Sequence, residues 1–137
     1  MAGMFTHHGI VIDGITHMSP AEALAEIQQG ALLLDIREDF MIAMKTFDLP
    51  EILYLPRSHF QSSLADLPRE RPVIVADAVG LYSKEAVRFL QRQGFENIAN
   101  LNGGISAWEE AGMPVTADPD HRWTGSCMCQ LRPRKGP

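Results

Sequence analysis

The chain has 137 residues, of which 45% are hydrophobic and 21% are charged, and this composition is typical of one globular domain. Its formal net charge of −5 disfavours nucleic acid as the main partner, because such binding depends on basic side chains that neutralise phosphates. The two cysteines, Cys127 and Cys129, lie close together near the C-terminal end, which excludes a small secreted scaffold stapled by disulfides. Any chemistry that needs a thiol must therefore use this end of the chain.

Charge is distributed unevenly along the chain. From Pro119 onward there are four basic residues and one acidic residue, so the preceding body is more acidic than the chain as a whole. The N-terminal residues lack the basic stretch followed by an apolar stretch that marks a secretory signal, and no apolar run approaches the roughly 18 residues of a membrane span. We therefore expect a cytoplasmic protein with neither nucleic acid nor a membrane as its partner.

The first predicted elements are an edge strand and a helix. The apolar run 10–12 predicts the strand. Ser19 and Glu22 have the spacing of a capping box, and Pro20 suits the first helical turn, so a helix is expected to begin here. Apolar residues then follow at helical spacing until Gly30, which is a natural C-terminal stop.

Short apolar runs alternate with amphipathic stretches through the rest of the body. Continuous apolar runs predict buried strands, and apolar residues three and four positions apart predict helices. In chain order the predicted elements are a strand over 32–36, a brief helix over 38–45, a strand over 52–55, a short helix from a second capping box at 58–61 toward Leu67, a strand over 73–76, a helix over 83–93, a strand over 97–101 and a helix over 105–111. Strands separated by helices predict a mainly parallel sheet that is covered on both faces.

Four stretches, met in order along the chain, carry a more specific signal. They are Leu34-Asp35-Ile36-Arg37-Glu38-Asp39-Phe40, the pairs Leu49-Pro50 and Leu55-Pro56, Gly94-Phe95-Glu96-Asn97-Ile98, and Leu101-Asn102-Gly103-Gly104-Ile105-Ser106-Ala107-Trp108 with its continuation Ala111-Gly112-Met113-Pro114-Val115. Together these stretches resemble the rhodanese (sulfurtransferase) family, although Phe47-Asp48 replaces the Gly-His pair that the family usually shows before the second stretch.

The resemblance implies a single α/β domain. It implies a rhodanese-like domain over 15–116 with a central five-stranded parallel sheet flanked by helices on both faces. An N-terminal extension over 1–14 then precedes the domain, and a basic tail over 117–137 follows it. Residues from about Thr116 onward show little apolar periodicity and are expected to be extended or mobile.

The resemblance also implies where the chemistry of the family would lie. In the family, the loop after the strand over 73–76 usually holds a cysteine nucleophile, cationic residues, a glycine and a serine. Backbone N–H groups at the start of the next helix point into this loop, where they lower the pKa of the thiol and hold a persulfide. Here the loop consists of Asp77, Ala78, Val79, Gly80, Leu81, Tyr82 and Ser83. Gly80 and Ser83 match the family, whereas Asp77 stands at the nucleophile position and Ala78 and Tyr82 stand at the cationic positions.

These replacements predict an inactive loop. A carboxylate at Asp77 cannot accept a sulfane sulfur, and neither Ala78 nor Tyr82 can attract an anionic sulfur donor. The related phosphatase chemistry, which needs a cysteine and an arginine in one loop, is excluded for the same reason. We interpret Asp77 as a built-in anion that satisfies the N–H groups of the loop, while mimicry of a persulfide for recognition by a partner and a role as general base remain alternatives.

Further residues surround this loop in the resemblance. Asp35 and Arg37 match residues that brace the active loop of the family through hydrogen bonds and ion pairing. Leu81 and Tyr82 make the rim of the loop more apolar than is usual, which fits either a partner-binding surface or the decay of an anion site.

The Cys127-Met128-Cys129 segment is not explained by the resemblance. Such a pair of thiols can share a metal ion, form a strained disulfide or pass a persulfide from one sulfur to the other. Two cysteines fall short of the four ligands of a structural zinc site. The histidines that could complete the set are His121 with His7, His8, His17 or His59. Because no spacing among them matches a zinc pattern, we expect no metal and no cofactor.

Three functional hypotheses follow. The first is a binding or regulatory module of sulfur metabolism or signalling, with an unknown protein or sulfur carrier as its partner. The second is a sulfurtransferase or persulfide carrier that uses Cys127 and Cys129 in place of a cysteine in the loop. The third is a metal or redox carrier that uses the same two cysteines.

Overall fold

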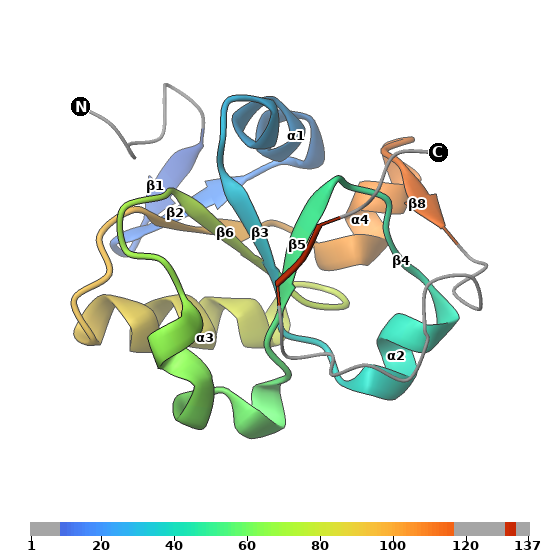
Figure 1. Cartoon of the computed structure of the whole chain (residues 1–137). Coiled ribbons are helices and arrows are strands. Elements are labelled where there is room, and N and C mark those ends of the chain that lie inside the picture. Colours follow the sequence, from blue (N-terminus) through green and yellow to red (C-terminus); the bar gives the residue numbers. More distant parts are fainter. Residues whose placement is uncertain (1–8, 117–130, 134–137) are drawn as a thin grey trace.

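A seven-stranded sheet forms the centre of the molecule. The computed structural model describes residues 9–116 and 131–133, and the strands lie in the order β1-β2-β7-β6-β3-β5-β9 (Figure 1). The five inner strands are β2 (Ile15–Met18), β7 (Ile98–Leu101), β6 (Val73–Ala76), β3 (Leu32–Asp35) and β5 (Glu51–Tyr54). All of these pair in parallel, which confirms the predicted five-stranded parallel sheet.

Each edge of the parallel sheet carries one antiparallel strand. At one edge β1 (Ile10–Ile12) pairs with β2, as the apolar run in the sequence predicts. At the other edge β9 (Leu131–Pro133) pairs with β5, so that Leu131 lies opposite Leu53. The strand β9 has no counterpart among the sequence predictions.

The inner strand β2 was also missed by the sequence analysis. It reads Ile-Thr-His-Met, so it has no continuous apolar run, and its buried residues Ile15 and Met18 face opposite sides of the sheet. A signal was nevertheless present in the Asp13-Gly14 pair, which lies between two short apolar runs. Both residues have positive φ angles, +53° and +79°, as the tight turn of a β-hairpin requires.

Helices cover both faces of the sheet and create two separate apolar cores. On one face lie α3 (Leu81–Arg92) and the 3-10 segments η1 (Arg57–His59) and η2 (Gln61–Asp66). On the other lie α1 (Pro20–Gln28), α2 (Asp39–Met44) and α4 (Gly104–Glu110). Alternate side chains of β3 divide between the cores, because Leu32 and Leu34 face α3 whereas Leu33 faces the other helices.

One of the two predicted capping boxes is present. The Ser19 hydroxyl accepts the Glu22 N–H at 3.2 Å, and the Glu22 carboxylate accepts the Ser19 N–H at 2.9 Å, so α1 begins as predicted. The second capping box, at Ser58, is wrong. The Ser58 N–H and hydroxyl donate instead to the Glu38 carboxylate, at 3.0 and 2.9 Å, and the segment forms η1 and η2. Ser58 therefore bonds to Glu38, a residue of another element, instead of capping a helix.

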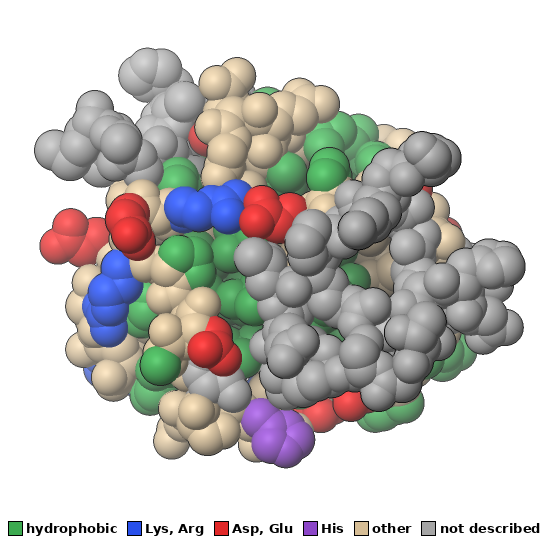
Figure 2. All heavy atoms as spheres, viewed as in Figure 1, with side chains coloured by type: hydrophobic (Ala, Val, Ile, Leu, Met, Phe, Trp, Pro, Cys, Tyr) green, Lys and Arg blue, Asp and Glu red, His purple; other side chains and the backbone are tan. Residues whose placement is uncertain are grey.

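Two smaller features complete the described part of the chain. The strands β4 (Thr46–Phe47) and β8 (Val115–Thr116) form a separate antiparallel pair, which ties the chain after α4 to the chain after α2. On the face seen in Figure 2, basic and acidic side chains lie interspersed, and no large patch of one sign is visible among the described residues. No helix in the described ranges is long and apolar enough to span a membrane.

Candidate functional site

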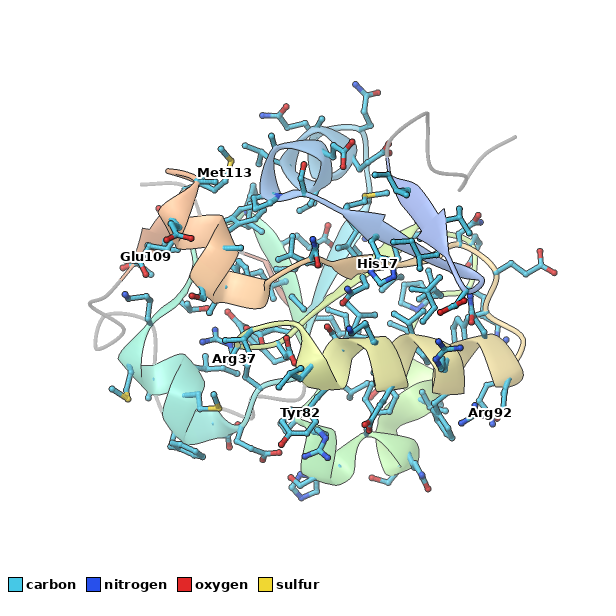
Figure 3. The ribbon with its side chains drawn as sticks, turned by 180° about the vertical axis from the view of Figure 1, so that it is seen from behind. His17, Arg37, Tyr82, Arg92, Glu109 and Met113 are labelled. Atoms are coloured by element: carbon cyan, nitrogen blue, oxygen red, sulfur yellow. The ribbon has the colours of Figure 1, made fainter. Side chains whose placement is uncertain are left out.

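The candidate site is the loop from Asp77 to Gly80, which connects β6 to α3. It lies at the carboxyl ends of the parallel strands, where open α/β sheets usually place their sites. Gly80 directly precedes the helix with a φ of +94°, a left-handed conformation that glycine adopts most easily. Figure 3 shows Arg37 and Tyr82 near this N-terminal end of α3.

The Asp77 carboxylate fills the inside of this loop. Its Oδ2 atom accepts the N–H groups of Tyr82 at 2.7 Å and Ser83 at 3.2 Å, and its Oδ1 atom accepts the Gly80 N–H. The first N–H groups of a helix have no acceptor within the helix, and they carry partial positive charge. Asp77 is buried. Its carboxylate therefore occupies the position at the start of α3 where a bound anion could otherwise lie.

The start of α4 holds the loop from the opposite side. The Ile105 N–H donates to the Asp77 carbonyl at 2.9 Å, and the Ser106 N–H donates to the Ala78 carbonyl at 3.1 Å. This contact depends on glycine, because a Cβ atom at Gly104 would lie 2.5 Å from the Asp77 carbonyl oxygen. The two helix starts therefore fix both the side chain and the backbone of the loop.

Asp35 and Arg37 form a buried ion pair at the end of β3. The Arg37 guanidinium donates to Asp35 through Nη2 at 2.8 Å and through Nε at 3.0 Å, and the Arg37 N–H also donates to Oδ1 at 3.0 Å. A pair with this two-pronged geometry is rigid. Arg37 also lines the cavity in front of Asp77, so the structure brings this pair to the loop.

The loop opens onto a small cavity with an apolar rim. The cavity has a volume of about 110 Å³, and its walls include Ile36, Met41, Val79 and Tyr82 as well as Asp77. The exposed fractions are 54% for Val79 and 47% for Tyr82, and 62% for Leu81, which adjoins Tyr82 in the sequence. Such exposure is high for large apolar side chains that lie together.

Arg57 is a member of this site that the sequence analysis missed. Its guanidinium lies over the Tyr82 ring, 3.7 Å from the centroid, which is a close cation–π stack. Ile36, Arg57 and Tyr82 line both the loop cavity and a larger hollow of about 510 Å³. No sequence signal could have linked Arg57 to Tyr82, because the two residues come from different elements.

A buried polar chain leads away from the loop through Ser83. The Ser83 hydroxyl donates to Oδ1 of Asn100, and Nδ2 of Asn100 lies 3.0 Å from Nδ1 of His17. Burial lowers the pKa of His17, and the positive charges of Lys84 and Arg88 lower it further, whereas Asp13 opposes them. From the sequence, His17 is predicted only as a candidate metal ligand, and Asn100 is not among the predicted site residues.

The other residues predicted from the sequence are the two cysteines and the remaining histidines. Cys127 and Cys129 lie outside the described residues, as do His7, His8 and His121. His59 is in η1 and lines the larger hollow. Within residues 9–116 and 131–133 there is no group of three or more His, Cys, Asp or Glu side chains that could hold a metal ion.

Comparison with known proteins shows the family of this chain. Residues 19–111 match the rhodanese-like domain. A protein named sulfurtransferase, from Allochromatium vinosum, is 32% identical over 107 residues, which cover 78% of this chain and 97% of that protein. The thiosulfate sulfurtransferase GlpE of Actinobacillus pleuropneumoniae is 32% identical over 102 residues, which cover 73% of this chain and 92% of that protein.

Solved structures agree with this match. A rhodanese-related protein from Thermoplasma volcanium has a TM-score of 0.66 and 28% identity, covering 81% of this chain and 99% of that one. The polysulfide-sulfur transferase homodimer from Wolinella succinogenes has a TM-score of 0.67 and 28% identity, covering 80% of this chain and 84% of that one. The chain described here belongs to the rhodanese-like domain family.

Proposed function

We propose that this rhodanese-like domain does not transfer sulfur at its loop and acts as a binding or regulatory module in sulfur metabolism or signalling. The observation that carries the proposal is the Asp77 carboxylate, which accepts the N–H groups of Gly80, Tyr82 and Ser83. In a loop with a cysteine at this position, those groups would face a persulfide. Here they are already occupied by a group of the protein itself.

The chemistry of sulfur transfer supports an inactive loop. In that reaction a thiolate attacks the outer sulfur of thiosulfate, the sulfur–sulfur bond breaks and sulfite leaves, so that a persulfide remains on the protein. A carboxylate is a poor nucleophile toward sulfur, and the buried charge of Asp77 repels an anionic donor. Ala78 and Tyr82 supply no positive charge to offset this repulsion.

The apolar rim of the loop supports a protein or a sulfur carrier as the partner. Val79, Leu81 and Tyr82 are exposed on a loop whose backbone is held by two helix starts. A rigid apolar projection of this kind loses little conformational entropy when a partner covers it. We place the protein and this partner in the cytoplasm.

Sulfur transfer from thiosulfate to cyanide tests the inactive loop. The wild-type chain is expected to form no thiocyanate above the uncatalysed rate. The variant Asp77→Cys/Ala78→Arg/Tyr82→Arg restores a thiol and two cations to the same scaffold, and it is expected to gain turnover. Wild-type turnover that survives the change of both tail cysteines to serine would overturn the proposal.

Quantitative affinity capture tests the rim as the partner surface. The variant Val79→Ser/Leu81→Ser removes two exposed apolar side chains from the loop. The control variant Phe40→Ser/Met44→Ser removes two others, 70% and 73% exposed, from α2. A partner that is lost with the loop variant and retained with the control supports the proposal, whereas equal capture by both variants contradicts it.

A second candidate function places sulfur chemistry on Cys127 and Cys129. The register of β9 favours it, because Leu131 lies opposite Leu53 in the half of β5 nearer its carboxyl end. Leu131, which follows Cys129 by two residues in the sequence, thus lies toward the edge of the sheet at which Asp77 follows β6. Wild-type turnover that disappears in Cys127→Ser/Cys129→Ser would favour this function, and metal in anaerobically purified protein would favour a metal carrier.

A further inference from the structure

A third cavity lies between α3 and the β1–β2 hairpin. Its volume is about 400 Å³, and it shares no lining residue with the loop cavity. Ile10 and Ile12 form part of an apolar wall, and their side chains are 66% and 55% exposed. His17, Lys84 and Arg88 also line the cavity, and Figure 3 shows His17 between the hairpin and α3.

In the part of the chain that the structure describes, the two cations of this cavity have no ion-pair partner. Lys84 and Arg88 are four residues apart, so they lie on the same face of α3. Among residues 9–116 and 131–133, neither side chain forms an ion pair or a hydrogen bond. Like charges at this spacing repel each other, so the pair does not stabilise the helix. An anion between the two side chains would relieve this repulsion.

Two carboxylates, Asp13 and Glu22, also line the cavity. Glu22 accepts the Ser19 N–H within the capping box, and Asp13 lies in the exposed hairpin turn. At the His17 ring, Lys84 and Arg88 each lower the pKa more than Asp13 raises it. At this imidazole the effect of the two cations therefore outweighs that of Asp13.

The polar chain from the loop fixes the orientation of the His17 ring. The Ser83 hydroxyl donates to Oδ1 of Asn100, so the amide group of Asn100 faces Nδ1 of His17 at 3.0 Å. Nδ1 accepts this hydrogen bond, and the neutral ring therefore carries its proton on Nε2. Asn100 is fully buried, so the ring is held by a group that cannot turn to solvent.

We propose that this cavity binds a small organic molecule that carries a phosphate-like oxyanion. Lys84 and Arg88 neutralise the oxyanion, the Nε2–H group of His17 donates a hydrogen bond to it, and Ile10 and Ile12 cover the apolar part of the molecule. The site goes beyond the proposed function of the loop and does not depend on it, because it uses other residues on another side of α3.

Titration of the histidine rings by NMR tests the proposal on the full chain. Inorganic phosphate and phenyl phosphate serve as probes, and sodium chloride at equal ionic strength serves as the control. Each probe is expected to shift the His17 resonances in a saturable way and to raise the pKa of His17, because the anion offsets Lys84 and Arg88. Phenyl phosphate is expected to bind at least about fivefold more tightly, since its ring covers apolar surface.

Variants separate this site from general attraction by surface charge. Lys84→Gln/Arg88→Gln is expected to weaken phenyl phosphate binding by about tenfold or more, because two charge-assisted contacts are lost. The control Arg92→Gln removes a charge from the same helix outside the cavity, and it is expected to leave the affinity within about twofold. Equal weakening by both variants, or an equal shift of His17 with chloride, would overturn the proposal.

Discussion

A single side chain, Asp77, sets the electrostatics of the loop. Its carboxylate accepts hydrogen bonds from the N–H groups of Tyr82 and Ser83 in the first turn of α3. The buried charge is thus stabilised by residues that follow it closely in the sequence. Hydrogen bonds from N–H groups to a charged acceptor are stronger than those to a neutral one. Asp77 therefore contributes to the stability of the fold whether or not a ligand reaches the loop.

The variant Asp77→Asn tests this contribution. It keeps the size of the side chain but removes the charge and places an amide group near the N–H groups of the loop. The free energy of unfolding is expected to fall by about 1–3 kcal/mol, measured by urea denaturation. The matched control Asp66→Asn, at an exposed position of η2, is expected to change it by less than about 0.5 kcal/mol. A loss no greater than that of the control would contradict the role of Asp77.

His17 makes the stability depend on pH. Its pKa in the folded chain lies below the ordinary value of 6.5, because the ring is partly buried and lies near Lys84 and Arg88. The unfolded chain therefore takes up a proton at higher pH than the folded chain, so the stability is full above pH 6.5 and decreases as the pH falls through this value toward the folded pKa.

The comparison of urea midpoints at pH 7.5 and pH 5.5 tests this dependence. The variant His17→Gln is expected to show a smaller decrease than the wild-type chain, because it lacks the group that takes up the proton. His59→Gln, which changes an exposed histidine of η1, is expected to keep the wild-type decrease. An unchanged decrease in His17→Gln would show that other groups cause it.

At the scale of elements, the loop depends on two helices that begin at the same place. The N–H groups at the start of α3 bind the Asp77 side chain, and those at the start of α4 bind the carbonyl groups of Asp77 and Ala78. Gly104 permits this approach because it has no side chain between α4 and the loop. The position of the loop is therefore a property of helix packing as well as of the loop sequence.

Gly104→Ala and Gly112→Ala separate packing from backbone strain. Both glycines have a positive φ, +63° and +83°, so alanine causes a strain of about 1–2 kcal/mol at either position. Only at Gly104 does the new Cβ atom also meet the loop, 2.5 Å from the Asp77 carbonyl oxygen, whereas nothing lies within 4 Å at Gly112. Thermal unfolding is expected to show a clearly larger loss for Gly104→Ala, and equal losses would contradict the close packing.

How far the sequence predicts the fold depends on whether an element carries its own signal. The strand β6 and the helix α3 could be predicted because a continuous apolar run and a helical repeat are local patterns. The strand β2 has no such run, and its identity depends on pairing with β7, which lies far along the chain. At Ser58 the local pattern was misleading, because the Glu38 carboxylate competes for the same hydroxyl.

The same distinction holds for the candidate site. That Asp77 would face N–H groups follows from its place between a strand and a helix, together with the family resemblance. The contacts between Arg57 and Tyr82 and between Asn100 and His17 join different elements, so only the assembled fold brings them together. Asp35 and Arg37 are two residues apart, and the strand end places both at the edge where the loop begins.

At the scale of the whole molecule, the strand β9 covers an edge of the sheet. It pairs with β5, whose Ile52 and Leu53 are buried, so removal of β9 would expose backbone groups beside apolar side chains. A bare edge of this kind pairs readily with another chain.

Truncation after Thr116 tests the role of this strand. The shortened chain is expected to associate as its concentration rises, which sedimentation velocity would detect, while its circular dichroism stays close to that of the full chain. The full chain with Cys127→Ser/Cys129→Ser keeps β9 and is expected to keep the wild-type oligomeric state. A truncated chain that sediments like the full chain would contradict this prediction.

The order of the strands in the sequence has a consequence for biosynthesis. On the ribosome, β5 is made before β6, α3, β7 and α4, whereas β9 follows all of them. The edge of β5 therefore stays open while the rest of the domain is being translated, and it is covered only when β9 has left the exit tunnel. During this interval the nascent chain depends on low local concentration or on a chaperone to avoid pairing with its neighbours.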